Sequence, residues 1–71
     1  MDKFQAAVVC ALQEHGQLFG RKLKEAIGYT GSGPSFYLQM AKLEQADVVV
    51  GKTVRFEMQG TELKGRAYQL K

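Results

Sequence analysis

Amide, hydroxyl and cationic side chains recur along residues 34–46, a segment that the sequence predicts to be helical. Ser35, Gln39 and Lys42 follow one another at four- and three-residue spacing, so a helix carries all three on one face. An amide can form two hydrogen bonds with the N6 and N7 edge of adenine, and hydroxyl and ammonium groups also bond base edges. This face therefore has the chemistry needed to read bases in the major groove of duplex DNA.

The residues around that face predict the helix itself. Ser32 can cap the first turn, and Pro34 follows where a first helical residue can lack its N–H. Phe36, Met40 and Leu43 recur at three- and four-residue spacing and form an apolar stripe on the opposite side. We therefore expect one side of this helix to be buried and the polar side to be exposed.

Two other helices and a short strand are expected before this segment. Residues 2–15 begin with a capping aspartate, carry an apolar stripe and are followed by Gly16, a residue typical of helix ends. Residues 17–19 are extended in character, and residues 20–27 predict a second helix that ends before Gly28. The first two helices and the strand supply the scaffold on which the polar helix can pack.

The second helix and the turn after it carry groups that can bind phosphate. Phosphates are bound by cations and by hydroxyl and amide donors at helix N-termini. The candidates for contact with the DNA backbone are Arg21, Lys22, Lys24, Thr30, Ser32 and Tyr37. The alternative is that the cations lie on an ordinary solvated helix and that the hydroxyls serve only as turn and cap groups.

Residues 48–70 predict a β-hairpin. Val54, Phe56 and Met58 alternate with polar residues, as in a strand with one buried face. Residues 59–65, with a glycine near each end, are expected to form the loop. The cations of the hairpin are candidates for contact with the DNA backbone or minor groove; they are Lys52, Arg55, Lys64 and Arg66. For the two arginines, the alternative is a cross-strand ion pair with Glu57 or Glu62.

The remaining apolar residues are assigned to one small core. The aromatic residues expected to point inward are Phe4, Phe19, Phe36, Phe56 and Tyr68. Cys10 is the only cysteine and lies in an apolar run, so we expect it to be a small buried residue rather than a redox or catalytic group.

Composition excludes several classes of protein. The 71 residues fit one domain, residues 1–71, with a formal net charge of +3, and the positive excess begins after the first helix. No stretch approaches the roughly 18 apolar residues that a membrane span needs, and no signal peptide is recognisable, so a cytoplasmic location is expected. One histidine and one cysteine predict no metal site, no cofactor and no enzyme active site.

Four segments resemble the PadR-like family of winged helix-turn-helix regulators. Residues 18–23 (LFGRKL) fit the family's L-x-G-x-x-L phrase, and Phe36 and Tyr37 lie near an aromatic position of its third helix. Residues 43–49 (LEQADVV) and 65–68 (GRAY) are similar to its L-E-x-x-G-L-[IV] and G-R-x-x-Y patterns. The resemblance implies an α+β fold of three helices followed by a C-terminal β-hairpin, the wing.

The same resemblance implies double-stranded DNA as the partner, with the third helix in the major groove and the wing on the backbone or minor groove. Asp47 replaces a family glycine, so we expect it to adopt the left-handed conformation that aspartate tolerates. The sequence stops at Lys71, before the helical segment through which typical members dimerise. A homodimer on DNA therefore remains an alternative to a monomer.

Two functions from different classes are consistent with these patterns. The first is sequence-specific duplex DNA binding by a small transcriptional regulator. The second is a winged-helix module that binds or assembles with other proteins and does not bind DNA. The directions of Arg21, Lys42 and Lys64 distinguish them, because a DNA-binding surface needs its cations on one side of the domain.

Overall fold

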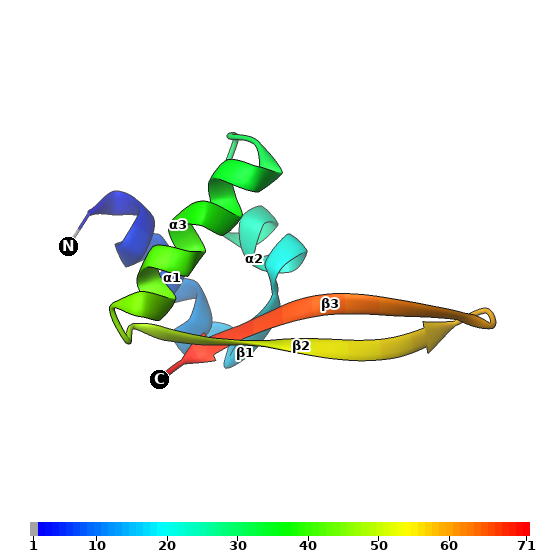
Figure 1. Ribbon diagram of the computed structural model, residues 1–71. Helices are drawn as coiled ribbons and strands as arrows, with labels where there is room; N and C mark the ends of the chain where they lie inside the picture. The colour runs from blue at the N-terminus through cyan, green and yellow to red at the C-terminus, as the bar shows by residue number, and fades with distance from the viewer. Residues whose placement is uncertain (1) are drawn as a thin grey trace.

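A computed structural model describes residues 2–71 as three helices and a three-stranded antiparallel sheet (Figure 1). The elements in chain order are α1 (Lys3–His15), β1 (Gln17–Phe19), α2 (Gly20–Ala26), α3 (Gly33–Gln45), β2 (Val49–Met58) and β3 (Thr61–Leu70). The expected α+β class and the order of the elements are confirmed.

Local sequence signals fix the ends of the helices. The Asp2 carboxylate accepts a hydrogen bond from the backbone N–H of Gln5 at 2.7 Å and caps α1. Gly16 follows α1 with φ of +80°, a conformation that glycine adopts without steric cost. The Ser32 hydroxyl caps α3 by accepting from the N–H of Ser35 at 3.2 Å. These caps lie where the sequence predicts them.

The sheet has the strand order β1-β3-β2, so β3 is central. β1 pairs with the last part of β3, from Gln17 opposite Gln69 to Phe19 opposite Ala67. β2 pairs with β3 along its full length, from Val49 opposite Leu70 to Met58 opposite Thr61. The β2–β3 hairpin (residues 49–70) is much longer than β1, and its outer half extends away from the helices (Figure 1).

The predicted loop over residues 59–65 is wrong. β3 begins at Thr61, and Gln59 and Gly60 alone connect the strands. Both turn residues have positive φ, +52° and +79°, as a type I′ turn requires. Since glutamine is unusual at the first of these positions, the sequence pattern did not reveal so tight a turn.

This turn leads to a stability prediction. Asparagine tolerates the left-handed conformation better than glutamine and is favoured at the first position of type I′ turns. We expect Gln59→Asn to increase the free energy of unfolding by about 0.5 kcal/mol, a gain of the size seen for favourable turn substitutions. Urea denaturation measures it, and Gln69→Asn, a change of the same chemistry within β3, is the control. A decrease in stability for Gln59→Asn would contradict the turn geometry.

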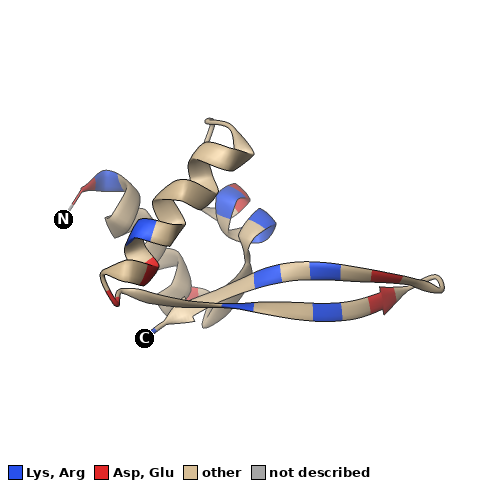
Figure 2. Ribbon diagram, viewed as in Figure 1, with Lys and Arg blue, Asp and Glu red and all other residues tan. Residues whose placement is uncertain are grey.

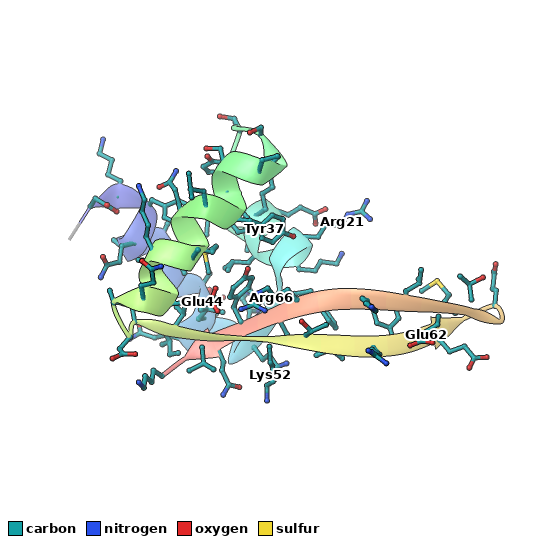
Figure 3. The ribbon with its side chains drawn as sticks, viewed as in Figure 1. Arg21, Tyr37, Glu44, Lys52, Glu62 and Arg66 are labelled. Carbon is teal, nitrogen blue, oxygen red and sulfur yellow. The ribbon has the colours of Figure 1, made fainter. Side chains whose placement is uncertain are left out.

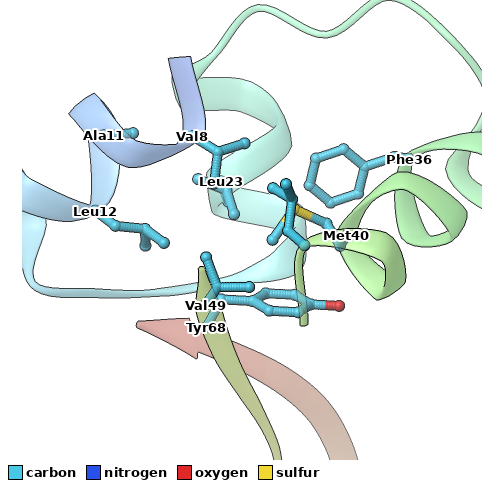
Figure 4. Packing of buried hydrophobic residues seen from close by; sticks show 9 residues of the cluster. Val8, Ala11, Leu12, Leu23, Phe36, Met40, Val49 and Tyr68 are labelled. Atoms are coloured by element: carbon cyan, nitrogen blue, oxygen red, sulfur yellow. The ribbon is translucent and has the colours of Figure 1, made fainter. Parts of the chain in front are cut away.

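The core lies between the three helices and the base of the sheet (Figure 4). Its largest fully buried side chains are Tyr68, Phe36, Leu12, Leu23, Met40, Val8 and Val49. Phe36 is central to the aromatic packing, with ring centroids 5.9 Å from Phe4, 5.5 Å from Tyr29 and 5.2 Å from Tyr37. The predicted apolar stripe of α3 is therefore the buried side.

Three residues assigned to the core are exposed instead. Phe19 and Phe56 retain 39% and 38% of their accessible surface. Phe19 lies opposite Ala67, on the face of the sheet away from the core residue Tyr68, and Phe56 lies in the outer half of the hairpin, away from the helices. Their rings pack on each other, with centroids 5.9 Å apart. Cys10 is exposed as well, because it lies on the side of α1 away from the core. Asp47 has a φ of +60°, as expected for an aspartate in a glycine position.

Candidate nucleic-acid interface

The side of α3 that the sequence assigns to base reading is divided in the structure. Ser35 and Gln39 lie on the flank near Tyr29 and are half-buried. The Tyr29 and Ser35 hydroxyls are 2.7 Å apart and share a hydrogen bond, while the Gln39 Nε2 donates to the Tyr29 hydroxyl at 3.4 Å. The Gln39 bond is long and therefore weak, so its amide can exchange partners more easily than Ser35 can.

Lys42 lies on the outer strip of α3 together with Leu38 and Gln45. All three are exposed, and Leu38 retains 61% of its accessible surface. Lys42 takes part in no ion pair within residues 2–71. Of the three predicted base-contacting residues, Lys42 is the one whose polar group extends outward without a protein partner in the described part of the chain.

A groove of about 450 Å³ lies between the start of α2, the flank of α3 and the hairpin. Four cations line it, Arg21 and Lys22 from α2 and Lys64 and Arg66 from β3, and no acidic residue is among the lining residues. Arg21, Tyr37 and Arg66 are labelled around this region in Figure 3. The apolar part of the lining comes from Phe19, Tyr37, Phe56 and Met58.

Two glycines shape this groove. A Cβ atom on Gly20 would lie 2.6 Å from the Tyr37 hydroxyl, so a side chain at residue 20 would require the tyrosine ring to shift from the start of α2. A Cβ atom on Gly65 would lie 3.0 Å from the Phe19 ring. Tyr37 is 43% exposed, which leaves it accessible beside the cations, as its predicted role in backbone contact requires.

Arg66 is held by an acid that the sequence analysis did not assign to it. Its Nη2 donates to Glu44 Oε1 at 2.5 Å, and this hydrogen bond raises the pKa of the guanidinium above its ordinary value. The guanidinium also lies 5.8 Å from the ring centroid of Tyr68. Glu57 and Glu62, the expected partners, make no ion pair with Arg66. The charge of Arg66 is thus partly compensated within the protein.

The other predicted cations are distributed over several surfaces. Lys22 and Arg55 form exposed ion pairs with Glu25 and Glu62, each at 3.8 Å, and the second is the expected cross-strand pair. Exposed pairs of this kind contribute little free energy, so a phosphate can replace the acid. Figure 2 shows the hairpin cations nearer the helices and its acids nearer the turn.

The register of the hairpin separates its four cations. Lys64 and Arg66 are two residues apart on β3, and Arg55 is directly opposite Lys64, so all three share one face. Lys52 is an odd number of residues from Arg55 and lies on the other face, which Figure 3 shows pointing away from the helices. The wing candidates therefore do not form one cluster.

The remaining backbone candidates have different surroundings. Lys24 lines a separate hollow with Arg21 and Tyr29 and is half-buried. Ser32 is engaged as the cap of α3, and Thr30 is exposed in the turn before it. The structure therefore gathers Arg21, Lys22, Tyr37, Lys64 and Arg66 around one groove and leaves the other candidates outside it.

The sequence analysis did not find the apolar lining of this groove. Phe19 and Phe56 were assigned to the core, and Met58 was expected on a buried face. For Phe56 and Met58, a two-residue turn at Gln59 and Gly60 is the signal that could have placed them, because it extends the paired strands to Met58, beyond the helices. No helix within residues 2–71 is long and apolar enough to cross a membrane. The same residues contain no group of three or more histidine, cysteine, aspartate or glutamate side chains that could hold a metal ion.

The sequence matches no model of a known protein family, and no curated protein matches it.

Proposed function

We propose that the chain is a winged helix-turn-helix domain, similar to those of PadR-like regulators, that binds duplex DNA in the cytoplasm as a small transcriptional regulator. The observation that carries the proposal is the acid-free groove lined by Arg21, Lys22, Lys64 and Arg66. Four cations on the same concave surface attract a polyanion. Because two of them come from α2 and two from β3, a phosphate backbone in the groove can contact cations on both of its sides.

In this proposal α3 enters the major groove and the hairpin acts as the wing. Lys42 contacts base edges from the outer strip, and Leu38 beside it can touch a thymine methyl group. Gln39 reads adenine after its long hydrogen bond with Tyr29 is exchanged for the base. Tyr37, Arg21 and Lys64 contact phosphates, and Lys52 on the opposite face of the wing does not.

A protein-interaction role is the second candidate. It is favoured by the exposed apolar residues of the hairpin, including Met58 at 57% and Leu63 at 38% exposure. The directions of the cations bear on this alternative: Arg21 and Lys64 line the same groove, but Lys42 is not among its lining residues. By this criterion, the shared groove of Arg21 and Lys64 supports DNA binding, and the separate position of Lys42 supports the second candidate.

Nuclear magnetic resonance with a random-sequence duplex tests the proposed interface. We expect the backbone amides of Arg21, Tyr37, Lys42 and Lys64 to shift at low salt, because all four lie on surfaces assigned to DNA. The amide of Glu14, on the exposed side of α1, should not shift. Shifts confined to α1, or none at low salt, would contradict the proposal.

One substitution tests base reading by α3. We expect Gln39→Ala to weaken binding to a preferred duplex, selected from random sequences, by about 1–3 kcal/mol, because a bidentate base contact is lost. Binding to random duplexes should stay unchanged. Gln13→Ala, an exposed amide on α1, is the control and should affect neither. An equal loss on both kinds of duplex would indicate that the wing, rather than α3, occupies the major groove.

A further inference from the structure

The outer edge of β2 is open. Within residues 2–71, β2 has β3 as its single neighbour in the sheet, and its pairing with β3 is continuous over ten residues. It contains no proline, which would interrupt the hydrogen bonding of an added strand. A long, unbroken edge of this kind presents unpaired N–H and C=O groups to another strand.

The side chains along this edge are apolar on one face and charged on the other. Val54, Phe56 and Met58 share one face, where Phe56 is 38% and Met58 57% exposed. Arg55 and Glu57 alternate with them on the other face. A strand added to β2 therefore has to place apolar residues beside the first set and charges of opposite sign beside the second.

Glu57 lacks a compensating charge. It lies directly opposite Glu62 in the hairpin, an arrangement of like charges that is unfavourable. Arg55 pairs with Glu62 at 3.8 Å, whereas Glu57 takes part in no ion pair within residues 2–71. A cation on an added strand, opposite Glu57, would compensate the negative charge of this glutamate.

We propose that a second copy of this chain pairs with β2 in the antiparallel direction, related by a two-fold axis that passes Phe56. In this register Arg55 lies opposite Glu57 of the partner subunit, and by symmetry Glu57 lies opposite Arg55 of the partner subunit. Val54 lies opposite Met58 of the partner subunit, and the two Phe56 rings adjoin. In this register residues 54–58 of the two β2 strands pair, and the two sheets join into one six-stranded sheet whose apolar and charged faces both match over this segment.

Neighbouring registers are less favourable. An axis at Arg55 places two arginines opposite each other, and an axis at Glu57 places two glutamates opposite each other. Both arrangements bring like charges together. Moving it to Val54 places Lys52 opposite Phe56 of the partner subunit and removes the contact between Arg55 and Glu57. The charge pattern of the edge thus selects the axis at Phe56.

The hydrogen-bonding pattern of the hairpin agrees with this axis. A two-residue turn makes Met58 and Thr61 a hydrogen-bonded pair, so the even-numbered residues of β2 bond to β3. The N–H and C=O groups of Arg55 and Glu57 then point outward. In the dimer these two residues form the hydrogen-bonded pairs, and the Phe56 pair is of the close, non-hydrogen-bonded type.

Charge exchange tests the proposal without reference to DNA. Sedimentation equilibrium of the wild-type chain should give the mass of two chains at high concentration. Arg55→Glu and Glu57→Arg should each increase the dissociation constant at least tenfold, because each sets like charges opposite one another. An equimolar mixture of the two variants should recover the mass of two chains, since every cross-strand pair in the heterodimer is then of opposite sign. This recovery also shows that both variants fold.

Disulfide formation tests the register. In a chain whose own cysteine is replaced by Cys10→Ser, Phe56→Cys should form a cross-linked dimer on oxidation, because Cα atoms about 4.5 Å apart permit a disulfide. Val54→Cys should not, because its two copies would be about 13 Å apart along the strands. A wild-type chain that stays monomeric at high concentration would overturn the proposal. So would a dimer unaffected by either charge reversal, which would indicate packing through the apolar faces.

Discussion

Replacing Phe36 by alanine is expected to destabilise the domain by about 3–5 kcal/mol. Phe36 is fully buried, and its ring packs against Phe4, Tyr29 and Tyr37 at the junction of α1, α3 and the turn between α2 and α3. The total stability of a domain of this size is roughly 4–11 kcal/mol, so the loss is a large fraction of it. Thermal denaturation should show a midpoint lowered by more than about 12 °C.

Leu38→Ala is the matched control for this prediction. It removes a large apolar side chain from the same helix, but Leu38 is 61% exposed on the outer strip. The change in its free energy of unfolding should be within about 0.5 kcal/mol. If the two alanine variants were equally stable, the orientation assigned to α3 would be incorrect.

The second large effect is expected on DNA affinity. Reversing the charge of two groove residues from different elements, in the double variant Arg21→Glu/Lys64→Glu, should weaken binding to any duplex at least a hundredfold. Each reversal removes a charge-assisted contact worth about 1.5–3 kcal/mol and adds repulsion from the phosphates. Fluorescence anisotropy of a labelled duplex at low salt measures the loss.

A control variant separates the groove from net charge. Lys3→Glu/Lys52→Glu changes the formal net charge of +3 by the same amount, but its residues lie on α1 and on the opposite face of the hairpin. We expect this control to lose less than tenfold in affinity, through long-range electrostatics alone. Equal losses in the two double variants would mean that the groove has no special role.

The features that the sequence predicted are those set by neighbouring residues. Helix ends follow from local caps such as Asp2 and Ser32, and these residues do cap α1 and α3. The core stripe of α3 follows from helical spacing, which the burial of Phe36 and Met40 confirms. Caps and periodicity act within a few residues, so they can be recognised without the rest of the fold.

The features that the sequence missed depend on distant segments. Alternation in β2 placed Phe56 and Met58 on one face correctly, but it cannot show whether any element covers that face. The pair formed by Glu44 and Arg66 joins residues 22 positions apart, and only the packing of α3 on β2 brings them together. Likewise, the hydrogen bond between Gln39 and the Tyr29 hydroxyl depends on how the segment between α2 and α3 packs on α3.

The salt dependence of duplex binding tests the central claim most directly. The four groove cations give about four phosphate contacts if α2 and the hairpin both contact the DNA backbone. The logarithm of the association constant should then fall with the logarithm of salt concentration with a slope of about −3 to −4. A slope near zero, or no binding of the wild-type chain to any duplex at low salt, would contradict DNA binding and favour a protein-interaction module.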